Sequence, residues 1–191
     1  MPVDHDLGSA RRLTTPYEGL VARGWDPDAP IPGPLSLHRA RVPADWVDYN
    51  DHMTESAYLH VVGDGADAFF RFFGIDEAYR AAGHSLFTAE THLHHLAEAA
   101  VDDELRVDLR LLDVDAKRLH VFHEVHNEST ERLAATAEQL LLHVDTRAGR
   151  VTPLPDHLLT RLRSIRAAHA RLPVPAAVGH VMQIPHATDG A

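Results

Sequence analysis

The sequence predicts an α+β fold in which one long helix packs against a mostly antiparallel sheet. The first observation is a run of apolar residues at helical spacing between Tyr58 and Phe73. The second is a set of four segments after Gly83 in which apolar and polar residues alternate. Short polar links join several of these segments, and strands joined in this way pair antiparallel. A helix covering such a sheet gives a two-layer architecture.

Each element follows from a local pattern. Residues 1–34 are rich in Pro, Gly and Asp and predict an extended arm. A first strand over 35–42 ends at Pro43, and the long helix ends at Gly74, a C-terminal cap. Gly63 and Gly65 inside this helix suggest close packing against the sheet. The remaining expected elements are a short helix over 76–82, strands over 85–96, 104–114, 119–126 and 133–146, and a helix from 156 to 172.

These patterns suggest three segments, namely an N-terminal arm (1–34), a central domain (35–147) and a C-terminal helix with a Pro-rich tail (148–191). The chain has 191 residues, a net charge of −10 and no cysteine. This charge disfavours nonspecific attraction to nucleic acid or to anionic membranes. The lack of cysteine excludes disulfides, thiolate zinc sites and cysteine nucleophiles. We expect a cytoplasmic protein without a membrane span.

The stretch from Trp46 to Glu55 carries the strongest chemical signal. It places Asp48, Asn50, Asp51 and His52 within five positions, immediately before the long helix. The first turn of a helix presents main-chain N–H groups that have no partner within the helix. Such groups can stabilise an oxyanion while a nearby carboxylate activates water or attacks directly. The pattern therefore indicates an enzyme that cleaves a thioester.

The same stretch resembles the Asp-x-x-Gly-His-(hydrophobic)-Asn signature of the hotdog-fold acyl-CoA thioesterases, the 4-hydroxybenzoyl-CoA thioesterase-like superfamily. The resemblance covers roughly residues 35–146 and implies an antiparallel sheet wrapped around one long central helix. It places Asp48 at the catalytic carboxylate and His52 at the signature histidine. Two positions depart from the signature, because Asp51 stands where Gly is usual and Thr54 where Asn is common.

Five stretches, two of them within this motif, together are similar to the betainyl-CoA thioesterases of carnitine breakdown. The resemblance to hotdog proteins implies an acyl-CoA substrate and a homodimer or higher homo-oligomer, and we expect no resident metal or cofactor. The matching stretches are Trp46–Asn50, His52–Ser56, Gly83–Ser85, Glu90–His92 and Lys117–His120.

Site roles follow from this match and from the chemistry of the side chains. Asp48 is expected to act as base or nucleophile, with His52 orienting water or the turn. A quaternary ammonium would need aromatic faces and a carboxylate, for which we name Trp46, Tyr49 and Glu90. The other expected substrate contacts are Asn50, Thr54 and Thr91. The phosphates of CoA would meet the basic residues Lys117, Arg118, Arg147 and Arg150.

Three alternatives remain at this level. A non-catalytic hotdog module could bind an acyl-CoA without cleaving it. A dehydratase on the same scaffold would also use acidic and His residues. A metal enzyme of the cupin type is suggested by His92, His94 and Glu98, with His123 and Asn127 as a second half.

Overall fold

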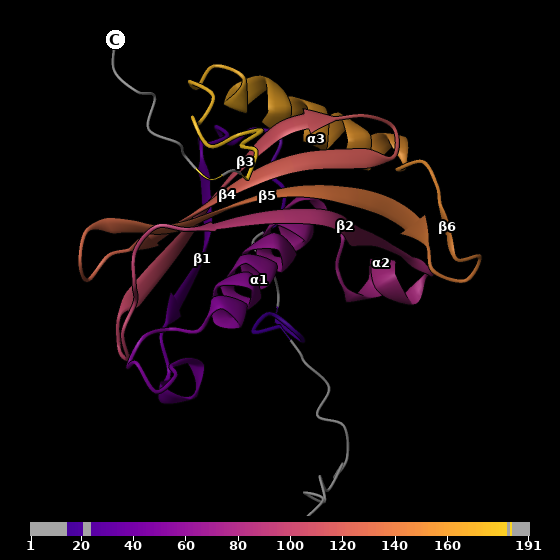
Figure 1. Ribbon diagram of the computed structural model, residues 1–191. Coiled ribbons are helices and arrows are strands. Elements are labelled where there is room, and N and C mark those ends of the chain that lie inside the picture. Colours follow the sequence, from indigo (N-terminus) through magenta and orange to yellow (C-terminus); the bar gives the residue numbers. More distant parts are fainter. Residues whose placement is uncertain (1–14, 21–23, 183, 185–191) are drawn as a thin grey trace, which may run out of the picture.

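The computed structural model describes residues 15–20, 24–182 and 184, and it forms one curled antiparallel sheet around a central helix (Figure 1). The strand order is β1-β3-β4-β5-β2, and the short β6 pairs with β5. The elements are β1 (Leu35–Arg41), η1 (Ala44–Trp46), α1 (Glu55–Phe73), α2 (Glu77–Ala81), β2 (His84–His95), β3 (Glu104–Val114), β4 (Arg118–Asn127), β5 (Arg132–Asp145), β6 (Arg150–Val151) and α3 (Asp156–His169).

Residue alternation in β3 and β4 decides which face of the sheet meets α1. Val107 pairs with Val125 and Leu109 with His123, so these side chains share the inner face. All four are buried. Most alternate positions carry polar side chains on the outer face, with Leu112 and Phe122 as apolar exceptions, which fits the two-layer architecture.

The helix α1 lies very close to the sheet. A Cβ atom built on Gly65 would lie 2.8 Å from Cγ1 of Val107, so only glycine fits at this point. The expectation of close packing is therefore confirmed for Gly65. It is wrong for Gly63, which is exposed and has open space where a Cβ would project.

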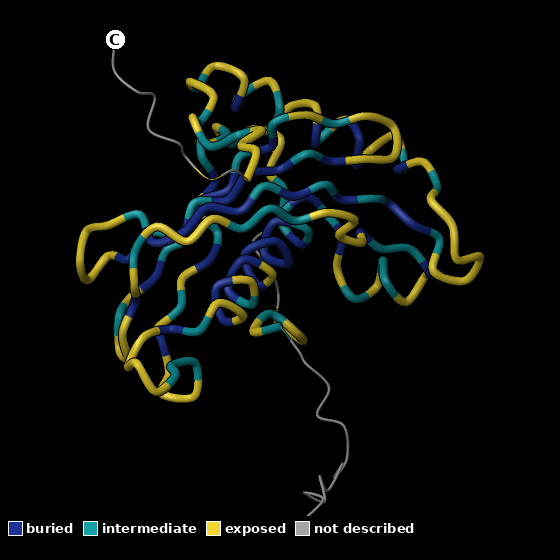
Figure 2. Tube along the Cα trace, in the orientation of Figure 1, coloured by how far each residue is buried: buried dark blue, intermediate teal, exposed yellow. Residues whose placement is uncertain are grey.

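Part of the face of α1 turned away from the sheet is also buried, and Figure 2 shows the helix mostly dark blue, with exposed turns near its start. Arg71 has a side chain that is 1% exposed and donates a hydrogen bond to Asp67 at 2.7 Å and another to Glu77 at 2.6 Å. Thr15 donates to the same Asp67 carboxylate at 2.7 Å. The segment 15–20 thus covers polar residues that the helical pattern alone would place in solvent.

The C-terminal helix α3 covers the part of β3 that extends beyond β1. Because Leu35, the first residue of β1, pairs with Leu109, the next residues of β3 have no strand on that side. The main-chain N–H of Leu111 donates instead to Nδ1 of His169 at 2.8 Å. Leu158, Leu162 and Ile165 join the same buried cluster as the end of α1, so this helix completes the core.

The observed elements confirm the expected order and lie within a few residues of the expected bounds. The two-residue strand β6 was not expected, and α3 ends at His169 rather than at 172. The main feature absent from the sequence prediction is the pairing of β2 with β5, which leaves one long side of β2 at the edge of the sheet. None of the helices in the described residues combines the length and hydrophobicity that crossing a bilayer requires.

His123 gives a prediction about the pH dependence of stability. It is fully buried against α1, and neither ring nitrogen has a hydrogen-bond partner among the described residues. Burial lowers the pKa of His123 from 6.5 to about 4, against a smaller opposing effect of Gln139. The unfolded chain therefore binds this proton more tightly, and the folded protein loses stability as the pH falls from about 6.5 to about 4.

We expect His123→Leu to remove roughly 3 kcal/mol of this acid-induced loss, as measured by urea unfolding at several pH values. The stability at pH 7 should be unchanged or higher, because an unpartnered buried imidazole is replaced by an apolar side chain. The control is His157→Gln, which changes an exposed histidine of α3. An unaltered pH profile in His123→Leu would contradict the assignment.

Candidate active site

A closed loop connects η1 to the start of α1. Val47 and Met53 form an isolated antiparallel bridge at its base. The N–H of Thr54 donates to the carbonyl of Trp46 at 2.9 Å, and the N–H of Met53 donates to the carbonyl of Ala99 at 2.7 Å. These bonds attach residues 47–53, named here the Asp48 loop, to the first turn of α1 and to the chain after β2.

Asp48 lies at the beginning of this loop and is half-buried. Its N–H donates to the carbonyl of His52 at 3.0 Å, which closes the loop. Its carboxylate accepts the N–H of Asn50 at 2.8 Å, and the Asn50 side-chain amide lies 3.4 Å from the second oxygen. Both oxygens are therefore oriented by Asn50, in an arrangement that Asp commonly forms in turns.

The position of Asp51 explains why glycine is usual there in the signature. Asp51 has φ of 60°, in the left-handed region that favours glycine. Its N–H donates to the carbonyl of Asp48 at 3.0 Å, so the turn requires this conformation. Asp tolerates it better than most residues with a Cβ.

The first turn of α1 offers main-chain donors next to this loop. Among the described residues, the N–H groups of Glu55 and Ser56 have no acceptor. Thr54 is the N-cap but makes no capping bond with its side chain, and its hydroxyl lies 3.3 Å from that of Ser56. The positive end of the helix dipole adds to these donors. The arrangement can stabilise negative charge on a carbonyl oxygen.

A shallow cleft of about 350 Å³ opens beside this turn, lined by His52, Met53, Glu55, Tyr58, His95, Leu96, Ala97 and Glu98. His52 thus faces the cleft, whereas Asp48 is not among its lining residues. Sequence reasoning placed Tyr58 in the core and Glu98 in a metal site, and it did not associate either with the substrate. The one available signal was Glu55, the last residue of the Trp46–Glu55 stretch.

The expected aromatic contacts are not gathered around Asp48. The Trp46 ring meets the His60 ring edge-on, with centroids 5.2 Å apart. Tyr49 is 93% exposed, so its ring has little protein around it. Their roles as substrate contacts stay predictions.

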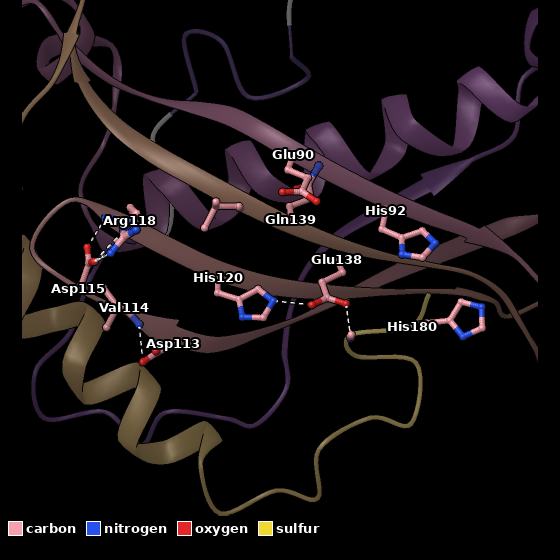
Figure 3. A pocket seen from close by; sticks show the side chains of 12 residues that line it. Glu90, His92, Asp113, Val114, Asp115, Arg118, His120, Glu138, Gln139 and His180 are labelled. Carbon is pink, nitrogen blue, oxygen red and sulfur yellow. Dashed lines mark hydrogen bonds and ion pairs between the residues drawn. The ribbon is translucent and has the colours of Figure 1, made fainter. Parts of the chain in front are cut away.

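Glu90 and Thr91 lie on opposite faces of β2, since successive strand residues alternate. Thr91 accepts a hydrogen bond from the buried Gln139 at 3.1 Å on the inner face. Glu90 instead lines a groove of about 430 Å³ on the outer face, with Glu138, His120 and His180 (Figure 3). The expected grouping of Glu90 with Trp46 and Tyr49 is therefore not found within one chain.

The four basic residues lie at the other end of the sheet from the Asp48 loop. Lys117 and Arg118 are in the β3–β4 hairpin and line a cavity of about 490 Å³ with Val151. Arg150 begins β6, and Arg147 donates to the carbonyl of Ala81 at 3.2 Å. Arg118 also pairs with Asp115 at 2.6 Å.

The residues of the metal alternative do not converge. His92 and His94 pair with Glu138 and Thr136, whereas Glu98 lies beyond the end of β2. Among the described residues, no group of three or more His, Asp or Glu side chains is arranged to hold a metal ion.

Comparison with known proteins decides the family. Residues 42–162 match the thioesterase-like superfamily. The chain belongs to this superfamily. Among solved structures, a hypothetical protein from Staphylococcus aureus, determined in complex with CoA, superposes with a TM-score of 0.74 at 27% identity. It covers 80% of this chain, and the match spans 97% of that protein. A putative thioesterase from Pseudomonas putida KT2440 has a TM-score of 0.70 at 30% identity, covering 80% of this chain and 98% of its own. The hotdog fold is thus confirmed, and the cupin alternative is wrong.

Curated relatives carry more specific names. A betainyl-CoA thioesterase from Pseudomonas aeruginosa is 38% identical over 79% of this chain and 96% of its own length. An L-carnitine dehydrogenase/betainyl-CoA thioesterase from Rhizobium meliloti is 42% identical over 92% of this chain. The chain spans only 36% of that longer relative and a similar share of two others.

The left-handed turn at Asp51 generates a second prediction. Asp51→Gly should leave the free energy of unfolding unchanged or raise it by up to about 1 kcal/mol, because glycine adopts this φ without a Cβ clash. Asp51→Val should lower it by about 1–2 kcal/mol, since β-branched residues fit this region poorly. Both values can be measured by urea unfolding. A marked loss of stability in the glycine variant would show instead that the Asp51 carboxylate supports the turn.

Proposed function

We propose that the chain is an acyl-CoA thioester hydrolase acting on betainyl-CoA, releasing glycine betaine and CoA. The observation that carries the proposal is the Asp48 loop, which delivers an oriented carboxylate directly before the free N–H groups of α1. The names of the relatives support the same chemistry and the same acyl group.

The chemistry requires three events at the thioester. Water adds to the carbonyl carbon, the carbonyl oxygen becomes negative, and the carbon–sulfur bond then breaks as the thiol gains a proton. Asp48 acts either as general base on the water or as a nucleophile that water later releases. The N–H groups of Glu55 and Ser56 hold the oxyanion, with assistance from the helix dipole.

A homodimer would bring the Asp48 loop of one subunit close to the basic residues of the other. β2 has 12 residues, so the two ends of the sheet lie about 35 Å apart, too far for one chain to bind CoA phosphates beside its own Asp48. In a continuous sheet, two β2 edges related by a two-fold axis normal to the sheet run antiparallel. The basic hairpins of one subunit then approach the Asp48 loop of the other. The exposed edge of β2 in Figure 1 supports this pairing.

Asp48→Asn tests the catalytic step. Asn keeps an oxygen for the Asn50 N–H, so the melting temperature should stay unchanged, whereas kcat/KM for betainyl-CoA should fall by about a thousandfold. Release of free thiol is the measurement. The control is Asp45→Asn, which changes an exposed carboxylate in η1. Wild-type binding of betainyl-CoA without thiol release would instead favour a non-catalytic module.

A complementation experiment tests the shared site. We expect Asp48→Asn and a Lys117→Ala/Arg118→Ala double variant each to have low activity at limiting betainyl-CoA. Unfolding and refolding the two together should restore about a quarter of wild-type activity, because half of the dimers are mixed and each has one intact site. Light scattering should give the mass of a dimer or larger assembly. A monomer, or a mixture without recovery, would contradict the shared site.

A further inference from the structure

The cleft beside the first turn of α1 has an unusual lining. Tyr58 forms its inner wall, where its hydroxyl donates to the carbonyl of Ala97 at 3.0 Å. The ring of His95 meets the Tyr58 ring edge-on, with centroids 5.0 Å apart. The Tyr58 hydroxyl is thus already bonded, and what the two residues add to the cleft is ring surface.

The same cleft carries negative charge. Glu55 and Glu98 both line it and both are exposed, while no lysine or arginine is among its lining residues. Burial raises the pKa of Tyr58, and the negative charges of Glu98 and Asp103 raise it further. Ring surface together with carboxylates, and without a required hydrogen-bond partner, suits a cation that has no N–H to donate.

The length of the acyl group restricts where its cation can bind. This step rests on the proposed function, in which the substrate is the thioester of trimethylglycine. Its nitrogen lies about 2.5 Å from the carbonyl carbon, the distance across an N–Cα–C unit. With the carbonyl oxygen at the α1 N–H groups, the cation must lie beside that turn. The outer groove around Glu90 and Glu138 is on the far face of the sheet and out of reach.

We propose that this cleft is the subsite for the quaternary ammonium group, with Glu55 and Glu98 supplying charge and Tyr58 and His95 supplying ring surface. The subsite also excludes neutral acyl groups. Without a cation, two carboxylates next to the oxyanion oppose the charge that develops in the transition state. The selectivity therefore has an attractive and a repulsive component.

A pair of substrates of equal shape tests this subsite. Betainyl-CoA is compared with tert-butylacetyl-CoA, in which carbon replaces the ammonium nitrogen and the charge is lost. The wild type should prefer betainyl-CoA in kcat/KM. Glu98→Gln and Glu55→Gln should each lower the ratio of kcat/KM for betainyl-CoA to kcat/KM for the neutral ester roughly tenfold. The preference for the cation should therefore shrink in both variants.

The control is Glu138→Gln in the outer groove, which should keep the wild-type ratio of the two substrates. A wild type that hydrolyses betainyl-CoA, with ratios unchanged in both Glu55→Gln and Glu98→Gln, would overturn the subsite alone. An equal loss on both substrates would overturn it as well, because a structural role would not distinguish charge. A wild type that cleaves neither ester would overturn the hydrolase proposal together with the subsite.

Discussion

The close contact between Gly65 and Val107 is the constraint on which the rest of the site depends. It allows the backbone of α1 to lie directly on the Val107 side chain of β3 at this point. The position of the helix in turn decides where its first turn meets the Asp48 loop and the end of β2. On the opposite side of the same helix, the buried Arg71 pairs with Asp67 of α1 and with Glu77 of α2. The N–H groups that we propose as oxyanion donors are thus placed by packing far from the loop itself.

Local patterns predicted the elements well because hydrophobic spacing is a property of neighbouring residues. The alternation in β3 and β4 and the glycine that ends α1 were sufficient for this purpose. The pairing of β2 with β5 could not be predicted in the same way, since residues 40 or more positions apart decide it. The burial of Arg71 also depends on a distant segment, the arm around Thr15 and Glu18.

The residues of the candidate site likewise fall into two groups, those placed by local sequence and those placed by contacts between distant segments. Asp48, Asn50 and His52 lie within five positions, so their local arrangement follows from one turn. The placement of Glu90 with Trp46 and Tyr49 required knowledge of strand faces, and β2 carries a register shift between Thr88 and Glu90. That shift determines that Thr91 faces inward and Glu90 outward. Tyr58 appears as an ordinary core residue in the helical pattern. In the structure it is buried and also lines the cleft.

Because the residues around the start of α1 are acidic, the charge of the substrate itself affects how well the oxyanion is stabilised. Asp48, Asp51, Glu55 and Glu98 lie in or next to the site, within a chain of net charge −10. Such a field works against an oxyanion, and the two free N–H groups and the helix dipole must overcome it. A cationic acyl group brings its own positive charge to within a few ångströms of that oxygen. Under the proposed function, the acidic site favours the transition state of a cationic thioester and disfavours that of its neutral analogues, so selectivity arises without a tight enclosure around the acyl group.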